Sequence, residues 1–160
     1  GFKELIYSFD YKNVHVVMLD TEGFNNFHAI GEAQLKWFKE DVEKNQKKTI
    51  FIFGHDPAYP VYNHIGSSLD KYAVERDELW GMFKKYKVSA YICGHEHLYN
   101  RAIHEGVYQI ISGGGGAHIS APEEKGGFYN FIVIDVKDDG AISITVKDIN
   151  GFIKDIFSIE

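Results

Sequence analysis

Strand-like apolar runs alternate with amphipathic helical stretches through the first part of the chain. The predicted strands are residues 14–19, Thr49–Phe53 and residues 89–93, and the predicted helices are Glu32–Lys44 and a segment through Leu79, Phe83 and Tyr86. The strand runs are largely apolar, which is typical of strands that are buried on both faces of a sheet. This order of elements predicts an α/β fold.

The C-terminal part is predicted to be a meander. Residues 128–136, 142–146 and 153–159 are strand-like, and Asp138-Asp139-Gly140 and Asn150-Gly151 are hairpin turn signals between them. Two more strand-like runs, residues 102–104 and Val107–Ser112, lead into four consecutive glycines at 113–116. We therefore expect mixed rather than purely parallel sheets.

Length and composition indicate one compact globular unit. The 160 residues are 44% hydrophobic and 15% aromatic, which excludes a disordered tail. The net charge of -6 is spread along the chain and leaves no basic patch for nucleic acid. No apolar run approaches the ~20 residues that a membrane segment needs. Cys93 lies in an apolar run, so we expect it to be a small core residue.

Two of the predicted strands end in the same way. Thr49–Phe53 is followed by Gly54-His55, and the run that ends at Cys93 is followed by Gly94-His95. In open α/β sheets, ligands bind beyond the carboxyl ends of the strands, and a glycine there allows a sharp turn. These histidines are therefore candidate ligands, although a single Gly-His at a strand end is also common without one.

The second of these strand ends carries another histidine. In Gly94-His95-Glu96-His97 the two imidazoles are at positions i and i+2. In extended backbone they would project to one side, with Glu96 pointing away. Histidine is the commonest metal ligand, and two adjacent buried imidazoles without a partner are costly. The spacing therefore favours His95 and His97 as metal ligands.

The motifs around these histidines resemble a known family. Gly54-His55-Asp56-Pro57-Ala58-Tyr59 and Gly94-His95-Glu96-His97-Leu98-Tyr99-Asn100-Arg101 are similar to the last two metal motifs of the calcineurin-like metallophosphoesterases, in particular of their purple acid phosphatase branch. Asn100 stands where glutamate is usual in that branch. Residues 7–10, 14–21 and 34–38 are similar to the preceding segments, so the resemblance covers residues 5 to about 118.

The resemblance implies a fold, a site and a reaction. The fold would be the C-terminal half of a four-layer αββα sandwich. His55 and His95 match ligands of the family's second metal, and His97 matches a ligand of the first. The cofactors would be two divalent or mixed-valence ions of iron, zinc or manganese, with a hydroxide between them as the nucleophile. The reaction would be hydrolysis of a phosphoester substrate, by a phosphatase or phosphodiesterase.

Other residues receive roles from the same comparison. His64 lies in a loop that resembles the one where a histidine of the purple branch faces the leaving group, and it is a candidate catalytic residue. Tyr59 and Tyr62 are candidates for the pocket border, and Arg101 is expected to pair with a carboxylate. The glycines at 113–116 look like the turn that follows the family's His-x-His strand. Four further histidines have no motif and are expected to pack or to face solvent: His15, His28, His104 and His118.

The motifs that carry the carboxylate ligands of the family's metal site do not occur in these 160 residues. The Asp-x-His, Gly-Asp-x-x-Asp (or Tyr) and Gly-Asn-His-Asp/Glu motifs of its N-terminal half are all missing. Asp20 and Asp56 could supply carboxylates, but an aspartate at a strand end usually caps or forms an ion pair. Residues 1–160 are thus expected to be the C-terminal portion of one domain, inactive alone. Its expected partners are the missing N-terminal half, or another copy of itself.

Rival interpretations stay open at this point. A metallo-β-lactamase-like site would need Asp and His directly after His-x-His, where Tyr99, Asn100 and Arg101 stand. An amidohydrolase barrel would carry its His-x-His on the first strand. A non-enzymatic alternative is that the chain is a structural or partner-binding module in which the metal-ligating histidines are vestigial. The compartment stays undetermined: the resemblance is compatible with an extracytoplasmic location, and any signal peptide would lie upstream of Gly1.

Overall fold

The computed structural model describes residues 5–23, 27–45 and 49–159. In chain order the main elements are β1 (Tyr7–Tyr11), β2 (Val14–Met18), α1 (Glu32–Lys44), β3 (Thr49–Phe53), the 3-10 helix η2 (Leu69–Tyr72), α2 (Ala73–Lys85), β4 (Ala90–Cys93), β5 (Tyr99–His104), β6 (Val107–Ser112), the 3-10 helix η3 (Glu123–Lys125), β7 (Asn130–Val136), β8 (Ile142–Asp148) and β9 (Ile153–Ile159).

The larger sheet has six strands in the order β1-β2-β3-β4-β6-β5. The four central strands β2, β3, β4 and β6 run parallel, and the edge strands β1 and β5 pair antiparallel with their neighbours. The expected mixed sheet is confirmed. β1 and the first half of β5 are strands that the apolar pattern did not predict, because both are edge strands whose residues are mostly half-buried or exposed.

The smaller sheet is the predicted meander β7-β8-β9, and both of its pairs are antiparallel. The two hairpin turns contain Gly140 and Gly151, whose φ angles of 88° and 84° lie in the left-handed region that favours glycine. The turn chemistry in the sequence therefore fixed this sheet locally.

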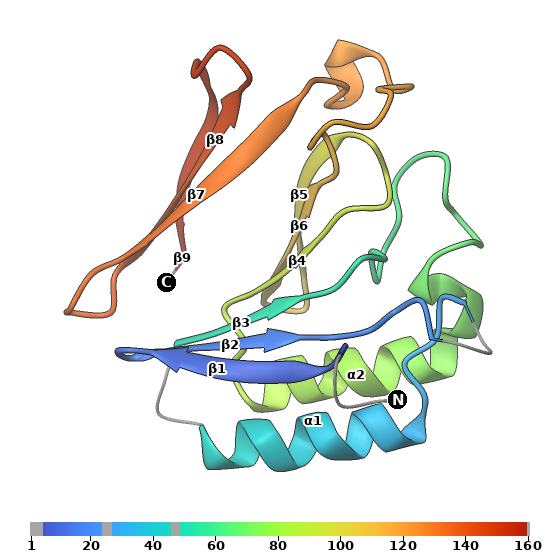
Figure 1. Ribbon diagram of the computed structural model, residues 1–160, viewed down its shortest axis with the longest axis vertical. Coiled ribbons are helices and arrows are strands. Elements are labelled where there is room, and N and C mark those ends of the chain that lie inside the picture. Colours follow the sequence, from blue (N-terminus) through green and yellow to red (C-terminus); the bar gives the residue numbers. More distant parts are fainter. Residues whose placement is uncertain (1–4, 24–26, 46–48, 160) are drawn as a thin grey trace.

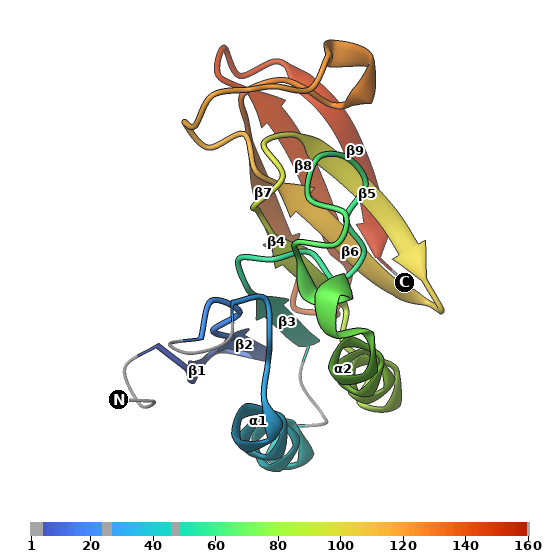
Figure 2. The ribbon, with the colours of Figure 1, turned by 90° about the vertical axis from the view of Figure 1, so that its right-hand side faces the viewer.

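The layers are helices, larger sheet and smaller sheet, and Figures 1 and 2 show α1 and α2 on one face of the larger sheet. The helices cover that face with one apolar cluster, in which Phe38 of α1 and Phe83 of α2 meet edge to face at 5.5 Å. The smaller sheet packs on the opposite face through a second cluster that includes Phe51, Ile110 and Ile144. The expected α/β metallophosphoesterase layering is thus present in the described residues.

This arrangement brings four connecting segments to one edge of the larger sheet. Parallel strands end at the same edge, so the segments that follow β2, β3, β4 and β6 adjoin one another there. Cys93 at the end of β4 is buried, as expected, and burial raises the pKa of its thiol well above the usual value. Among the described helices, none combines the length and the apolar character that crossing a bilayer requires.

Candidate metal centre

Backbone hydrogen bonds hold the two Gly-His turns against each other. The amide of Gly54 donates to the carbonyl of Ile92 at 3.1 Å, and the amide of Gly94 donates to the carbonyl of His55 at 3.0 Å. These bonds continue the parallel pairing of β3 and β4 beyond the strands themselves. As a result, Nδ1 of His95 lies 3.1 Å from Nε2 of His55. The structure brings together two of the three predicted ligands.

The second turn differs from the extended backbone that the sequence suggested. His95 has a φ angle of +62°, in the left-handed region, and the amides of Glu96 and Leu98 each donate to the carbonyl two residues before, at 2.7 Å. The extended backbone that was assumed between His95 and His97 is therefore wrong. A non-glycine residue in this region is uncommon, and such strained residues cluster at active sites and ligand-binding sites.

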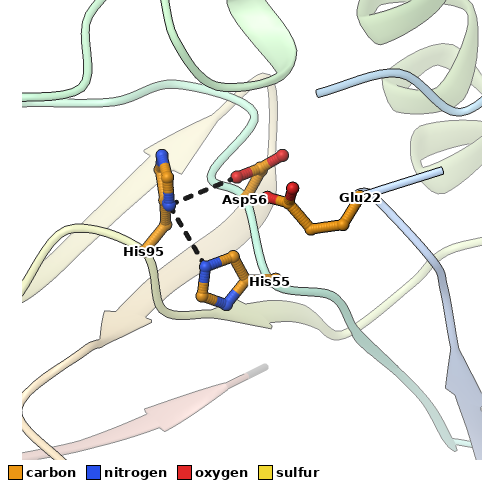
Figure 3. A group of neighbouring side chains, drawn as sticks. All are labelled: Glu22, His55, Asp56 and His95. Atoms are coloured by element: carbon orange, nitrogen blue, oxygen red, sulfur yellow. Dashed lines mark hydrogen bonds and ion pairs between the residues drawn. The ribbon is translucent and has the colours of Figure 1, made fainter. Parts of the chain in front are cut away.

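Two carboxylates join the paired histidines. Single ligand atoms of Glu22, His55, Asp56 and His95 all lie within 4.8 Å of one another, and we call these four residues the ligand group. Figure 3 shows them pointing toward a common point, with Glu22 arriving from the segment after β2. The described residues thus supply two imidazoles and two carboxylates at one place.

Asp56 is the most informative member of the ligand group. Its side chain is 0% exposed, and Oδ2 lies 3.0 Å from Nδ1 of His28. Oδ1 lies 3.5 Å from Nδ1 of His95 but has no hydrogen-bond partner in the described structure. A buried carboxylate oxygen without a donor is costly, and a cation between it and the imidazoles would compensate that cost. Nitrogen and carboxylate donors in this combination suit zinc, iron or manganese.

Sequence reasoning missed Glu22 and His28. Glu22 follows β2. The rule that ligands bind beyond the carboxyl ends of parallel strands pointed to His55 and His95, and applied to the end of β2 it would also have pointed to Glu22. Asp20, which we considered instead, accepts a hydrogen bond from the amide of Glu22 at 2.9 Å and acts as a turn residue. His28, expected to face solvent or pack, contacts Asp56, and no local motif marks it.

His97 lies outside the ligand group. Its Nδ1 is 2.9 Å from the carbonyl oxygen of His118, so Nδ1 carries the proton and a neutral ring presents Nε2 as its lone-pair nitrogen. A carbonyl also orients His95, whose Nε2 lies 2.8 Å from the oxygen of Ser67. That contact makes Nδ1 of a neutral His95 the nitrogen that faces the ligand group. Metal-binding histidines are commonly oriented by such partners.

The predicted catalytic residue His64 contacts the same site. Its ring centroid is 3.9 Å from that of His95. Burial, followed by the electrostatic influence of the neighbouring His95, lowers the pKa of His64 below its usual value. The loop therefore delivers a titratable group directly beside the ligand group.

Two other residues named from the sequence, His15 and Arg101, contact carboxylates outside the ligand group. His15 is 2% exposed and lies 2.7 Å from carboxylate oxygens of both Asp10 and Asp41, which makes it a packing residue as expected. Arg101 forms the expected carboxylate pair, at 3.1 Å from Asp155.

His104 packs against the loop that carries the site. Its ring stacks on Tyr59 at 4.0 Å between centroids, and Nε2 is buried without a hydrogen-bond partner in the described structure. Burial, and then the nearby Arg76 guanidinium, lower the pKa of His104 below 6.5. The folded state therefore favours the neutral ring.

We expect this histidine to make stability depend on pH. Because the unfolded chain binds the proton more tightly, the contribution is fully present above about pH 6.5 and is lost as the pH falls toward the lowered pKa. Chemical denaturation of the chain and of His104→Phe, at pH 7.5 and pH 5, measures it. The free energy of unfolding should fall less on acidification for His104→Phe, and equal losses in both proteins would contradict the expectation.

Comparisons with known proteins agree with this geometry. Residues 4–99 match the family model of the calcineurin-like phosphoesterases. Purple acid phosphatase 23 of Arabidopsis thaliana is 31% identical over 97 residues, which are 61% of this chain and 20% of that protein. The chain therefore spans 20% of the length of this curated relative.

Solved structures show the same fold. The purple acid phosphatase PPD1 from yellow lupin (Lupinus luteus) superposes with a TM-score of 0.75 at 17% identity, over 97% of this chain and 32% of that one. GAP50, the anchor in the inner membrane complex of Plasmodium, gives a TM-score of 0.72 at 17% identity, over 97% and 53%. Together with the matched family model, these findings confirm the resemblance seen in the sequence, and the chain belongs to the calcineurin-like phosphoesterase family.

Proposed function

We propose that the full-length protein containing this chain is a metal-dependent hydrolase of phosphoesters, and that this chain supplies the histidine share of its metal site. The observation that supports the proposal most is the meeting of His55, His95 and the buried Asp56 at adjacent strand ends. Family membership supports phosphoesters as the substrate class.

The chain's own donors would hold the metal ions. His55 and His95, whose facing nitrogens are 3.1 Å apart, would bind one ion, with Asp56 and Glu22 as carboxylates available at the same place. His97, outside this group, would bind a second ion, of iron, zinc or manganese like the first. When bound, such ions supply an activated water and positive charge opposite the phosphate oxygens.

His64 would handle the proton of the leaving group. Its ring lies against His95, so a phosphoester at the ligand group would bring its leaving oxygen near this imidazole. His64 would donate a proton to this oxygen, a role that suits histidine because its usual pKa lies near neutrality.

An uncovered apolar surface supports the proposal that an N-terminal half of the domain packs against this chain. A groove of about 450 Å³ runs between β1–β3 and the end of β7, and its lining includes Phe9, Val16, Phe53 and Val136. Phe9 and its neighbour Tyr11 are 49% and 67% exposed. The N-terminal half of the domain would cover this surface, and a second copy of the chain is the alternative occupant.

The test compares the full-length protein with the isolated chain. We expect the full-length protein to contain about two metal ions and to hydrolyse an aryl phosphate, with activity lost on chelation. The isolated chain should be inactive, because the second metal position would have His97 as its one proposed ligand, fewer than the usual three or four protein ligands per ion.

Two results would contradict the proposal. Absence of both metal and turnover in the full-length protein would leave a structural or partner-binding module. Chelator-sensitive turnover by the isolated 160 residues would show that the absent motifs are dispensable. The same assay after mixing with the N-terminal half provides the comparison.

A further inference from the structure

Glu96, between the two histidines of the second turn, is a buried carboxylate outside the ligand group. It is 1% exposed, although it follows directly after His95. Among the described residues, no lysine, arginine or histidine forms an ion pair with it. A buried carboxylate needs strong compensation, so its partners indicate its role.

Those partners are backbone amides of a single loop. Oε2 accepts a hydrogen bond from the amide of Val61 at 2.7 Å, and Oε1 accepts from the amides of Tyr62 and His64 at 2.5 and 3.3 Å. Successive amides around one anion form a nest, and bonds to a charged acceptor are stronger than neutral ones. Glu96 thus holds the backbone of the loop that carries His64.

The same loop acts back on the ligand group. The carbonyl of Ser67 lies 2.8 Å from Nε2 of His95 and orients that ring, while the ring of His64 packs against it. The carbonyl of His64 in turn accepts hydrogen bonds from the amide of Ser67 and the hydroxyl of Ser68, both at 3.0 Å. The loop is therefore closed on itself, and Glu96 fixes its approach to the site.

We propose that Glu96 is a positioning residue, which fixes the 61–67 loop so that His64 and the Ser67 carbonyl are held against His95. For its effect on turnover, the inference rests on the proposed function. The effect of Glu96 on the loop does not depend on turnover, so the proposed function and the positioning role of Glu96 can be refuted separately.

The first measurement is amide hydrogen exchange in the full-length protein. The amides of Val61, Tyr62 and His64 should exchange slowly in the wild type although they lie in a loop, because each donates to a buried acceptor. In Glu96→Gln, an NH2 group replaces one of the oxygens that these amides face. Their exchange should accelerate about tenfold or more, while Glu40→Gln, on the exposed face of α1, should leave it unchanged.

The second measurement is kinetic and separates positioning from general destabilisation. Glu96→Gln should retain the metal content and lower kcat on an aryl phosphate by about tenfold, the lower end of the range seen when residues that orient metal ligands are changed. In a His64→Ala background the same substitution should have a much smaller effect, because residues that act as a unit are not additive.

Each outcome decides the inference. Protected amides in the wild type, faster exchange in Glu96→Gln and non-additive kinetics with His64→Ala support it. Rapid exchange of the three amides in the wild type would overturn it without any variant, even if Glu96→Gln did not fold. Additive losses of kcat would overturn the link to His64. If the full-length protein had no phosphoesterase activity, the proposed function would fall while the exchange result still decided the role of Glu96 in the loop.

Discussion

Replacing His95 by alanine in the full-length protein should abolish most phosphoester hydrolysis. His95 faces His55 at 3.1 Å and Asp56 at 3.5 Å, so its loss removes the central nitrogen donor of the ligand group. A lost metal ligand removes activated water and charge compensation together, which costs several kcal/mol or roughly a hundred- to thousandfold in kcat/KM. His97→Ala should act similarly through the second ion. Aryl phosphate kinetics and metal analysis measure both effects.

Two further variants test whether the loss of activity comes from the missing imidazole or from a strained backbone. His95 has a left-handed φ of +62°, which alanine disfavours but glycine adopts readily, so His95→Gly should lose the same activity without backbone strain. His15→Ala is a matched control, because His15 lies on β2, bound by Asp10 and Asp41 and outside the ligand group. Wild-type activity in His95→Gly or His97→Ala would refute the ligand assignment.

Replacing Gly113 by alanine should destabilise the fold and displace the second turn. A Cβ there would overlap the carbonyl oxygen of Glu96 and lie 2.8 Å from its carbonyl carbon. The amide of Gly113 is bonded to the carbonyl of Leu98 at 2.9 Å, so neither backbone segment can yield easily. Overpacking of this kind costs roughly 1–3 kcal/mol or more, which lowers the melting temperature by several degrees.

The glycine run supplies its own control. An added Cβ at Gly115 meets nothing within 4 Å, so Gly115→Ala should keep the stability and activity of the wild type. Thermal unfolding of the two full-length variants, together with their metal content, checks the difference. An unchanged melting temperature in Gly113→Ala would show that the second turn tolerates displacement.

Local sequence was sufficient for most elements of the fold. α1 and β3 have the predicted bounds, because apolar residues at helical spacing and a continuous β-branched and aromatic run each favour one structure strongly. The hairpins of the smaller sheet followed from glycine turns. β1 was missed because an exposed edge strand buries little and carries no apolar run.

The candidate site was predictable only in part. The Gly-His ends of β3 and β4 indicated His55 and His95, because parallel neighbours end at one edge of a sheet. Glu22 and His28 reach the site from the segment after β2. The side chain of Glu96 accepts hydrogen bonds from a loop that is distant from it in the sequence. Such contacts join residues more than 25 positions apart, as the separation of 28 between His28 and Asp56 shows.

The sequence by itself determined the strand and helix order, the turn glycines and the histidine motifs that identify the family, since these depend on local conformation and on residue spacing. Only the tertiary structure decided which nitrogen of His95 faces the ligand group, that Asp56 keeps a buried oxygen without a donor, and that Glu96 serves the loop. The direction of a side chain at a strand end depends on the left-handed turn at His95 and on partners from other elements, which no local pattern encodes.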